Sequence, residues 1–103
     1  MLKYVVEEND YWVDWKDKYP SEEIITTYNR KEALKAFSES AWRKLHVKEG
    51  NESFSIMCNL KGIVWGYPDN MFYVPIDAFE YLSERQKSLF NEIVNELKVM
   101  NNI

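Results

Sequence analysis

The sequence predicts an α+β fold: a mixed or antiparallel sheet of four to five strands with two helices packed on one face. Three observations predict it. Several short segments alternate apolar and polar residues, two capping sequences each precede apolar residues at helical spacing, and strands adjoin in the second half without helical crossovers. The expected order is β-(β)-β-α-β-β-β-α, in a single domain of residues 1–103.

The N-terminal third predicts two or three strands. Residues 2–7 alternate Leu2, Tyr4 and Val6 with more polar neighbours, which indicates a strand with one buried face. Residues 11–15 alternate again, so we expect a hairpin over 2–16 with Tyr11, Val13 and Trp15 on one face. Residues 18–23, which contain Pro20, should form a loop leading into a β-branched strand over 24–28.

A first helix should begin after Asn29. Asn29 is a typical N-cap residue, and Glu32 stands where a capping box requires a glutamate. We expect the helix to continue until Gly50 stops it, which places His46 near its end. Its apolar stripe would comprise Ala33, Leu34, Phe37, Ala41, Trp42 and Leu45.

The second half predicts a three-stranded antiparallel meander followed by a helix. Residues 53–60 alternate, and segments 63–67 and 71–76 flank a turn at Pro68. Ser83 and Gln86 form a second capping box. The apolar residues at helical spacing behind it are Leu89, Phe90, Ile93, Val94, Leu97 and Met100.

Composition narrows the function classes. The pI near 5.0 disfavours direct binding to nucleic acid, because phosphate contacts require clustered Lys and Arg. No apolar run approaches the roughly 20 residues that cross a bilayer, so we expect no membrane contact. A single cysteine, Cys58, excludes an internal disulfide and fits a cytoplasmic location.

No catalytic or cofactor signature is present, so we expect a protein that is not an enzyme and binds no cofactor. His46 is the only histidine, and Cys58 shares strand parity with apolar residues that should face the core. Five carboxylates could supply oxygen ligands to Ca²⁺ or Mg²⁺ but lack calcium-loop spacing, and we interpret them as a solvated acidic edge without a metal: Glu7, Glu8, Asp10, Asp14 and Asp17.

The charge distribution points to the N-terminal segment as a contact surface. Residues 1–23 hold seven carboxylates against three lysines and so carry the whole net charge of −4. Trp and Tyr are enriched at interface cores, while charges at the rim speed encounter with an oppositely charged partner. We therefore expect a small acidic protein-binding module that masks a basic partner surface, as toxin antidotes and phage or mobile-element inhibitors of nucleic-acid enzymes do. The predicted partner-binding residues are Asp10, Tyr11, Trp12, Asp14, Trp15, Asp17, Tyr19, Glu22 and Glu23.

An alternative interpretation is a protein that binds a small molecule or nucleotide. Aromatic residues also gather in the second half, where they could line a pocket between the sheet and the helices. The predicted ligand-binding residues are Trp42, Trp65, Tyr67 and Tyr73. Exposed rings on an edge strand could also pair with a second copy, so both a monomer and a homodimer are compatible with the sequence.

Overall fold

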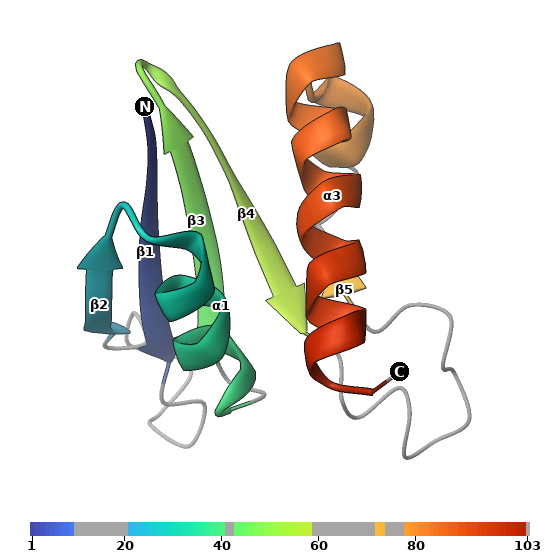
Figure 1. Cartoon of the computed structure of the whole chain (residues 1–103). Coiled ribbons are helices and arrows are strands. Elements are labelled where there is room, and N and C mark those ends of the chain that lie inside the picture. Colours follow the sequence, from blue (N-terminus) through green and yellow to red (C-terminus); the bar gives the residue numbers. More distant parts are fainter. Residues whose placement is uncertain (10–20, 41–42, 59–71, 74–77, 103) are drawn as a thin grey trace, which may run out of the picture.

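The computed structural model describes residues 1–9, 21–40, 43–58, 72–73 and 78–102 (Figure 1). These residues form an antiparallel sheet of four main strands and a short fifth, with two α-helices, which confirms the predicted α+β class. In chain order the elements are β1 (Leu2–Asn9), β2 (Ser21–Thr27), α1 (Arg30–Ser38), β3 (Arg43–Glu49), β4 (Glu52–Cys58), β5 (Phe72–Tyr73), the 3₁₀ turn η2 (Ala78–Tyr81) and α3 (Glu84–Met100).

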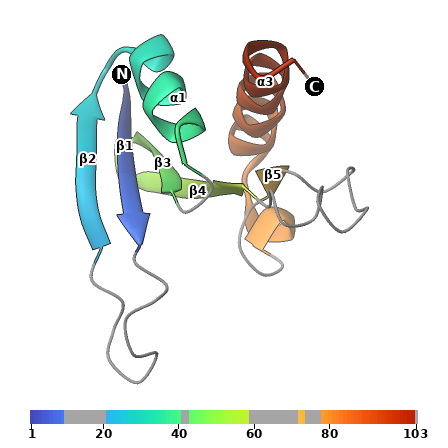
Figure 2. The same cartoon turned by 90° about the horizontal axis from the view of Figure 1, so that it is seen from below.

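The sheet has the strand order β2-β1-β3-β4-β5, and every neighbouring pair is antiparallel. Strand β1 therefore lies inside the sheet, and β2 forms one edge. Figure 2 shows α1 and α3 on the same side of the sheet, as predicted. We call that side the inner face and the opposite side the outer face.

One hydrophobic core joins the inner face to both helices. Along β1, β3 and β4 alternate residues point inward, because side chains along a strand alternate between the two faces. The helices contribute residues at three- and four-residue spacing. The core comprises Tyr4, Val6, Ala33, Leu34, Phe37, Leu45, Val47, Phe54, Ile56, Leu89, Ile93 and Leu97.

The first helix is shorter than predicted. It ends at Ser38, and residues 43–49, which we expected to continue it, form β3. In this segment Leu45 and Val47 are buried while the residues between them are only half-buried or exposed, so the period is two. Consequently His46 lies in the middle of a strand and not at a helix end. Ala41 and Trp42, two members of the predicted stripe, lie outside the described residues.

Polar groups cap the C-terminal end of α1. Arg43, the first residue of β3, donates a hydrogen bond from Nη1 to the carbonyl oxygen of Ala36 and pairs with Glu39. The same carbonyl oxygen accepts a hydrogen bond from the backbone N–H of the C-cap residue Glu39, so two donors meet it at the end of the helix.

Both predicted N-caps are present. Asn29 Oδ1 accepts a hydrogen bond from the Glu32 N–H at 3.2 Å, although the Asn29 N–H donates to Thr27 Oγ1 and not to Glu32. At the start of α3 the capping box is complete, because Ser83 and Gln86 each accept a hydrogen bond from the other's backbone N–H. These caps fix where the two helices begin.

Gly50 has a different role from the one predicted. It occupies the two-residue turn with Asn51 that joins β3 to β4, and Glu49 and Glu52 pair on either side of it. Its φ of +60° lies in the left-handed region that glycine adopts without strain. A glycine with positive φ at the first central position is typical of a type II′ hairpin turn.

The pairing of the strands differs from prediction in three places. Both edges of β1 are occupied by β2 and β3, so its hairpin partner is β2 and not residues 11–15. Ser21–Glu23, predicted as loop, already belong to β2. Met57 of β4 lies between β3 and β5, so β4 pairs with residues 72–73 where a meander would place 63–67. Residues 11–15 and 63–67 lie outside the described residues, so these two strands stay predictions.

Candidate functional site

The end of β1 and the start of β2 form what we call the acidic corner: Glu7, Glu8, Glu22 and Glu23. In the antiparallel register Glu7 stands opposite Glu23, and Glu8 stands opposite Glu22. Like charges directly opposite one another destabilise a sheet, by roughly 0.2–1 kcal/mol per pair. Glu22 and Glu23 are exposed, and they lie on the edge strand β2. The corner therefore concentrates negative charge at an accessible edge at a cost in stability.

The glutamates of β1 lie beside basic side chains of β3, whereas for those of β2 the described residues give no such contact. Glu8 Oε1 lies 3.7 Å from Arg43 Nε, and Glu7 Oε2 lies 3.1 Å from His46 Nε2. Glu23 accepts a hydrogen bond from the Thr26 hydroxyl at 2.7 Å. Within the described part of the chain, no cation pairs with Glu22 or Glu23. These two carboxylates are thus available to a cation from another molecule.

Of the predicted partner-binding residues, Glu22 and Glu23 are described and both belong to this corner. The other seven lie outside the described residues, in the segment that joins β1 to β2; they are Asp10, Tyr11, Trp12, Asp14, Trp15, Asp17 and Tyr19. Asn9 and Ser21, the described residues on either side of that segment, pair at the corner. The prediction missed Glu7 and Glu8 as members of this surface, and the signal for them is the register of β1 against β2.

A second arrangement lies on the outer face, where Glu7, His46 and Ser55 stand in a row across β1, β3 and β4. The Ser55 hydroxyl and His46 Nδ1 are 2.7 Å apart, and the two residues are directly opposed cross-strand partners. If Nε2 carries the proton that faces Glu7, Nδ1 accepts the hydroxyl hydrogen of Ser55. Val5, directly opposite His46 on β1, is only 5% exposed. Hydrogen-bonded cross-strand pairs of this kind stabilise a sheet, and we interpret the row as a structural network.

Nothing in the described ranges brings together three His, Cys, Asp or Glu side chains that could hold a metal ion. His46 contacts Ser55 and Glu7, both from strands that flank its own. The backbone of Cys58 belongs to β4, while its side chain is not among those described.

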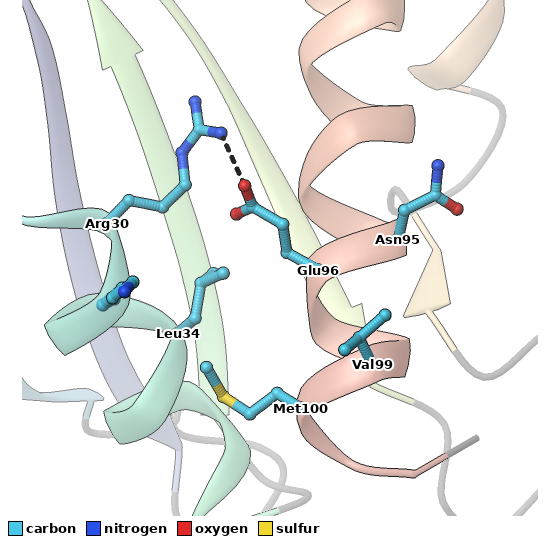
Figure 3. Close-up of a pocket in the computed structure, with 7 residues that line it drawn as sticks. Arg30, Leu34, Asn95, Glu96, Val99 and Met100 are labelled. Atoms are coloured by element: carbon cyan, nitrogen blue, oxygen red, sulfur yellow. Dashed lines mark hydrogen bonds and ion pairs between the residues drawn. The ribbon is translucent and has the colours of Figure 1, made fainter.

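The third arrangement is a groove of about 700 Å³ between α1 and α3 (Figure 3). Figure 3 shows Arg30 and Leu34 of α1 facing Glu96 and Met100 of α3 across it. Leu34 is a core residue and forms part of the groove floor. The lining residues are Arg30, Lys31, Leu34, Asn95, Glu96, Val99 and Met100.

Polar contacts tie the helices together at both ends of the groove. At one end Arg30 Nη1 donates to Glu92 at 2.8 Å and to Glu96 at 3.3 Å, while Arg30 Nε donates to the Tyr4 hydroxyl at 2.9 Å. Partial burial lowers the pKa of Arg30, but the hydrogen bonds to Tyr4 and Glu92 outweigh it and raise the pKa above its ordinary value. At the other end Asn101 Nδ2 donates to the Ser38 hydroxyl at 3.1 Å.

The residues of the predicted aromatic pocket are not described well enough to place that pocket. Trp42, Trp65 and Tyr67 lie outside the described residues, and for Tyr73 the structure describes the backbone in β5 but not the side chain. The aromatic pocket therefore stays a prediction.

No helix among the described residues is long and apolar enough to span a lipid bilayer. In comparisons with known proteins, no protein-family model matches the chain, and neither the curated proteins nor the solved structures yield a significant match.

Proposed function

We propose that this chain is a protein-binding module that docks a partner with a basic surface through the acidic corner and the adjoining segment 10–19. The observation that carries the proposal is the register of β1 and β2, which sets Glu22 and Glu23 beside Glu8 and Glu7 at an exposed edge. Like charges directly opposite one another destabilise a sheet, and the acidic corner brings two such pairs together at one end of β1 and β2. An external basic surface would neutralise this corner and turn an unfavourable feature of the free protein into a source of affinity.

The neighbouring sequence supplies the rest of an interface. Between Asn9 and Ser21 the chain carries four aromatic residues and three aspartates. Interfaces combine desolvated Trp and Tyr anchors with charges that steer encounter. In this proposal the module masks the partner's basic surface, as an antidote or a phage or mobile-element inhibitor of a nucleic-acid enzyme would.

The test first captures a partner from the native host and identifies it by mass spectrometry. Its affinity is then measured for variants of this chain in which charges of the proposed surface are reversed. Two variants reverse the proposed surface: Glu22→Lys with Glu23→Lys, and Asp14→Lys with Asp17→Lys. Each should weaken binding roughly ten-fold or more, because both attraction and steering are lost. Affinity of the unmodified chain should also fall as salt rises.

The matched control is Glu52→Lys with Glu80→Lys. It makes the same change in net charge with two exposed residues, and Glu52 lies at the end of the sheet opposite to the acidic corner. Binding should be nearly unchanged in this control. A partner that tolerates both reversed pairs, or binds equally at low and high salt, would contradict the proposed function.

A further inference from the structure

The side of β2 turned away from β1, which we call the free edge, is covered by no described strand. β2 is the last strand in the order β2-β1-β3-β4-β5, and Figure 2 shows it as the outermost strand of the sheet. In an antiparallel strand, the N–H and C=O groups of alternate residues point away from the partner strand. Within the described ranges, no backbone–backbone hydrogen bond joins Ser21–Thr27 to a segment other than β1. Such an edge is a template for one more strand.

β2 is already held in place on its other side. It pairs with β1 from Ser21 to Thr27, and Ile24 and Ile25 pack against the hydrophobic core. Because the strand is ordered beforehand, an added segment pays the entropic cost of ordering itself alone. Lys and Pro, which protect many sheet edges against pairing, are both absent from the sequence of β2.

One irregularity limits which kind of segment fits the free edge. The register shifts between Val6 and Glu7, so that Ile24 is an extra residue of β2 without a partner on β1. An extra residue of this kind bends and twists its strand. A flexible extended segment can follow the bend, whereas the regular edge of a second sheet would lose its register there. The geometry thus favours a peptide segment over a folded sheet.

The charges beside the free edge favour a basic segment. Glu22 and Glu23 are neighbours along β2, so their side chains point to opposite faces of the sheet. Two successive basic residues on an added strand would meet one carboxylate on each face. With His46 neutral, the charged residues of the corner and those beside it on β3 and at the end of α1 are five carboxylates and two cations, which leaves three negative charges: Glu7, Glu8, Glu22, Glu23 and Glu39 against Arg43 and Lys44. A second copy of β2 would add further carboxylates.

We infer that the partner docks by adding an extended segment to the free edge of β2, with two successive basic residues opposite Glu22 and Glu23. The segment runs antiparallel to β2, as in every other strand pair of this sheet. Backbone hydrogen bonds provide affinity, and the two carboxylates provide specificity. The inference rests on the proposed function, because it names the kind of segment that the acidic corner receives.

The experiment titrates the full-length chain, labelled with ¹⁵N, with the peptide acetyl-Thr-Val-Thr-Val-Thr-Lys-Lys-Thr-amide. Its lysines lie opposite Glu22 and Glu23 when its last threonine pairs with Ser21. The peptide should bind saturably, shift amide resonances of β2 and slow the hydrogen exchange of alternate β2 amides. The same peptide with Glu-Glu in place of Lys-Lys should bind roughly ten-fold more weakly. No saturable binding of the lysine peptide, or equal binding of the two peptides, would overturn the inference.

Two N-methylated forms of the lysine peptide separate strand addition from attraction between side chains. One form is methylated at its odd residues and the other at its even residues, so each keeps its charges and loses the donors of one edge. One form should bind like the parent peptide, and the other roughly ten-fold more weakly, because its methyl groups face β2. Equal affinity of the two forms would overturn strand addition. The proposed function would still be supported if charge reversal weakened binding of the host partner.

Charge exchange on the protein tests the basic residues of the segment. Glu22→Lys with Glu23→Lys should weaken binding of the lysine peptide and strengthen binding of the glutamate peptide. The control Glu52→Lys with Glu80→Lys, both exposed residues, should leave both affinities nearly unchanged. Undiminished binding of the lysine peptide to the first variant would overturn the assignment of the basic residues.

Sedimentation and hydrogen exchange of the free protein test the competing occupant. The free protein should sediment without a dimer formed through β2, and alternate β2 amides should exchange rapidly. A dimer in which these amides are already protected would show that a second copy covers the free edge, and it would overturn the inference.

Discussion

Arg85 and Glu49 join the first turn of α3 to the last residue of β3. Arg85 Nε lies 3.3 Å from one carboxylate oxygen of Glu49, and Nη2 lies 3.2 Å from the other, so the pair has the two-pronged geometry that a guanidinium favours. The hydrogen bond from Arg85 holds the pKa of Glu49 below its ordinary value. This pair connects two elements that the sequence separates by 36 residues.

The lowered pKa makes the contribution of this pair dependent on pH. A carboxyl whose pKa is lower in the folded than in the unfolded chain stabilises the fold above its ordinary pKa. That stability is lost as the pH falls through the lowered value. Glu49→Gln should therefore reduce the melting temperature at neutral pH and have no effect at a pH well below the pKa of Glu49. Thermal unfolding followed by circular dichroism measures both.

Glu80→Gln is the control for this prediction, since Glu80 is exposed and has no ion pair within the described ranges. Its melting temperature should follow that of the unmodified chain at every pH. An equal decrease of the melting temperature by Glu49→Gln at both pH values would show that the decrease comes from packing and not from charge.

Among the elements, β1 and β2 hold two opposed glutamate pairs, which belong to the surface that we propose binds a partner. Replacing Glu22 by Lys turns the Glu8–Glu22 pair from repulsive to attractive. The free energy of unfolding should rise by about 0.5–1 kcal/mol, while binding to the basic partner weakens. Urea denaturation measures the first effect. When Glu8 is replaced by Gln, Glu22→Lys should no longer raise the free energy of unfolding. An increase that persists would show that it does not come from the Glu8–Glu22 pair.

The helices and strands illustrate which elements a single sequence predicts. The α3 helix is predicted well, because its capping box and its apolar residues are all local signals. The span from Arg30 to Glu49 is harder. Leu45 satisfies both a helical spacing from Leu34 and a strand alternation with Val47, so its burial alone does not choose between them. Pairing with β1 and β4 decides for the strand, and that pairing is long-range.

The candidate sites also contain residues that local sequence predicts and residues that only long-range contacts identify. Glu22 and Glu23 are predictable from charge clustering along the chain. The inclusion of Glu7 and Glu8 depends on the strand register. The groove was not predictable, because Arg30 meets Glu92 and Glu96 across 62 and 66 residues of sequence.

For the whole molecule, the last helix completes a core begun by the first strand. Leu89, Ile93 and Leu97 belong to the same buried cluster as Tyr4 and Val6. Elements that share one core open together, because removing any of them exposes apolar surface on the others. We therefore expect the sheet and both helices to unfold as one cooperative unit.

Ile93→Ala tests this cooperativity. Ile93 is fully buried, so the truncation should cost roughly 2–5 kcal/mol through lost burial and a residual cavity. Native-state hydrogen exchange should show the same loss of protection for the slowest amides of β1, β3 and α3. Val99→Ala on the exposed side of α3 serves as the control and should change stability by less than about 0.5 kcal/mol. A loss confined to α3 would mean that this helix opens by itself. The core that supports both the acidic corner and the groove would then have to be stable without it.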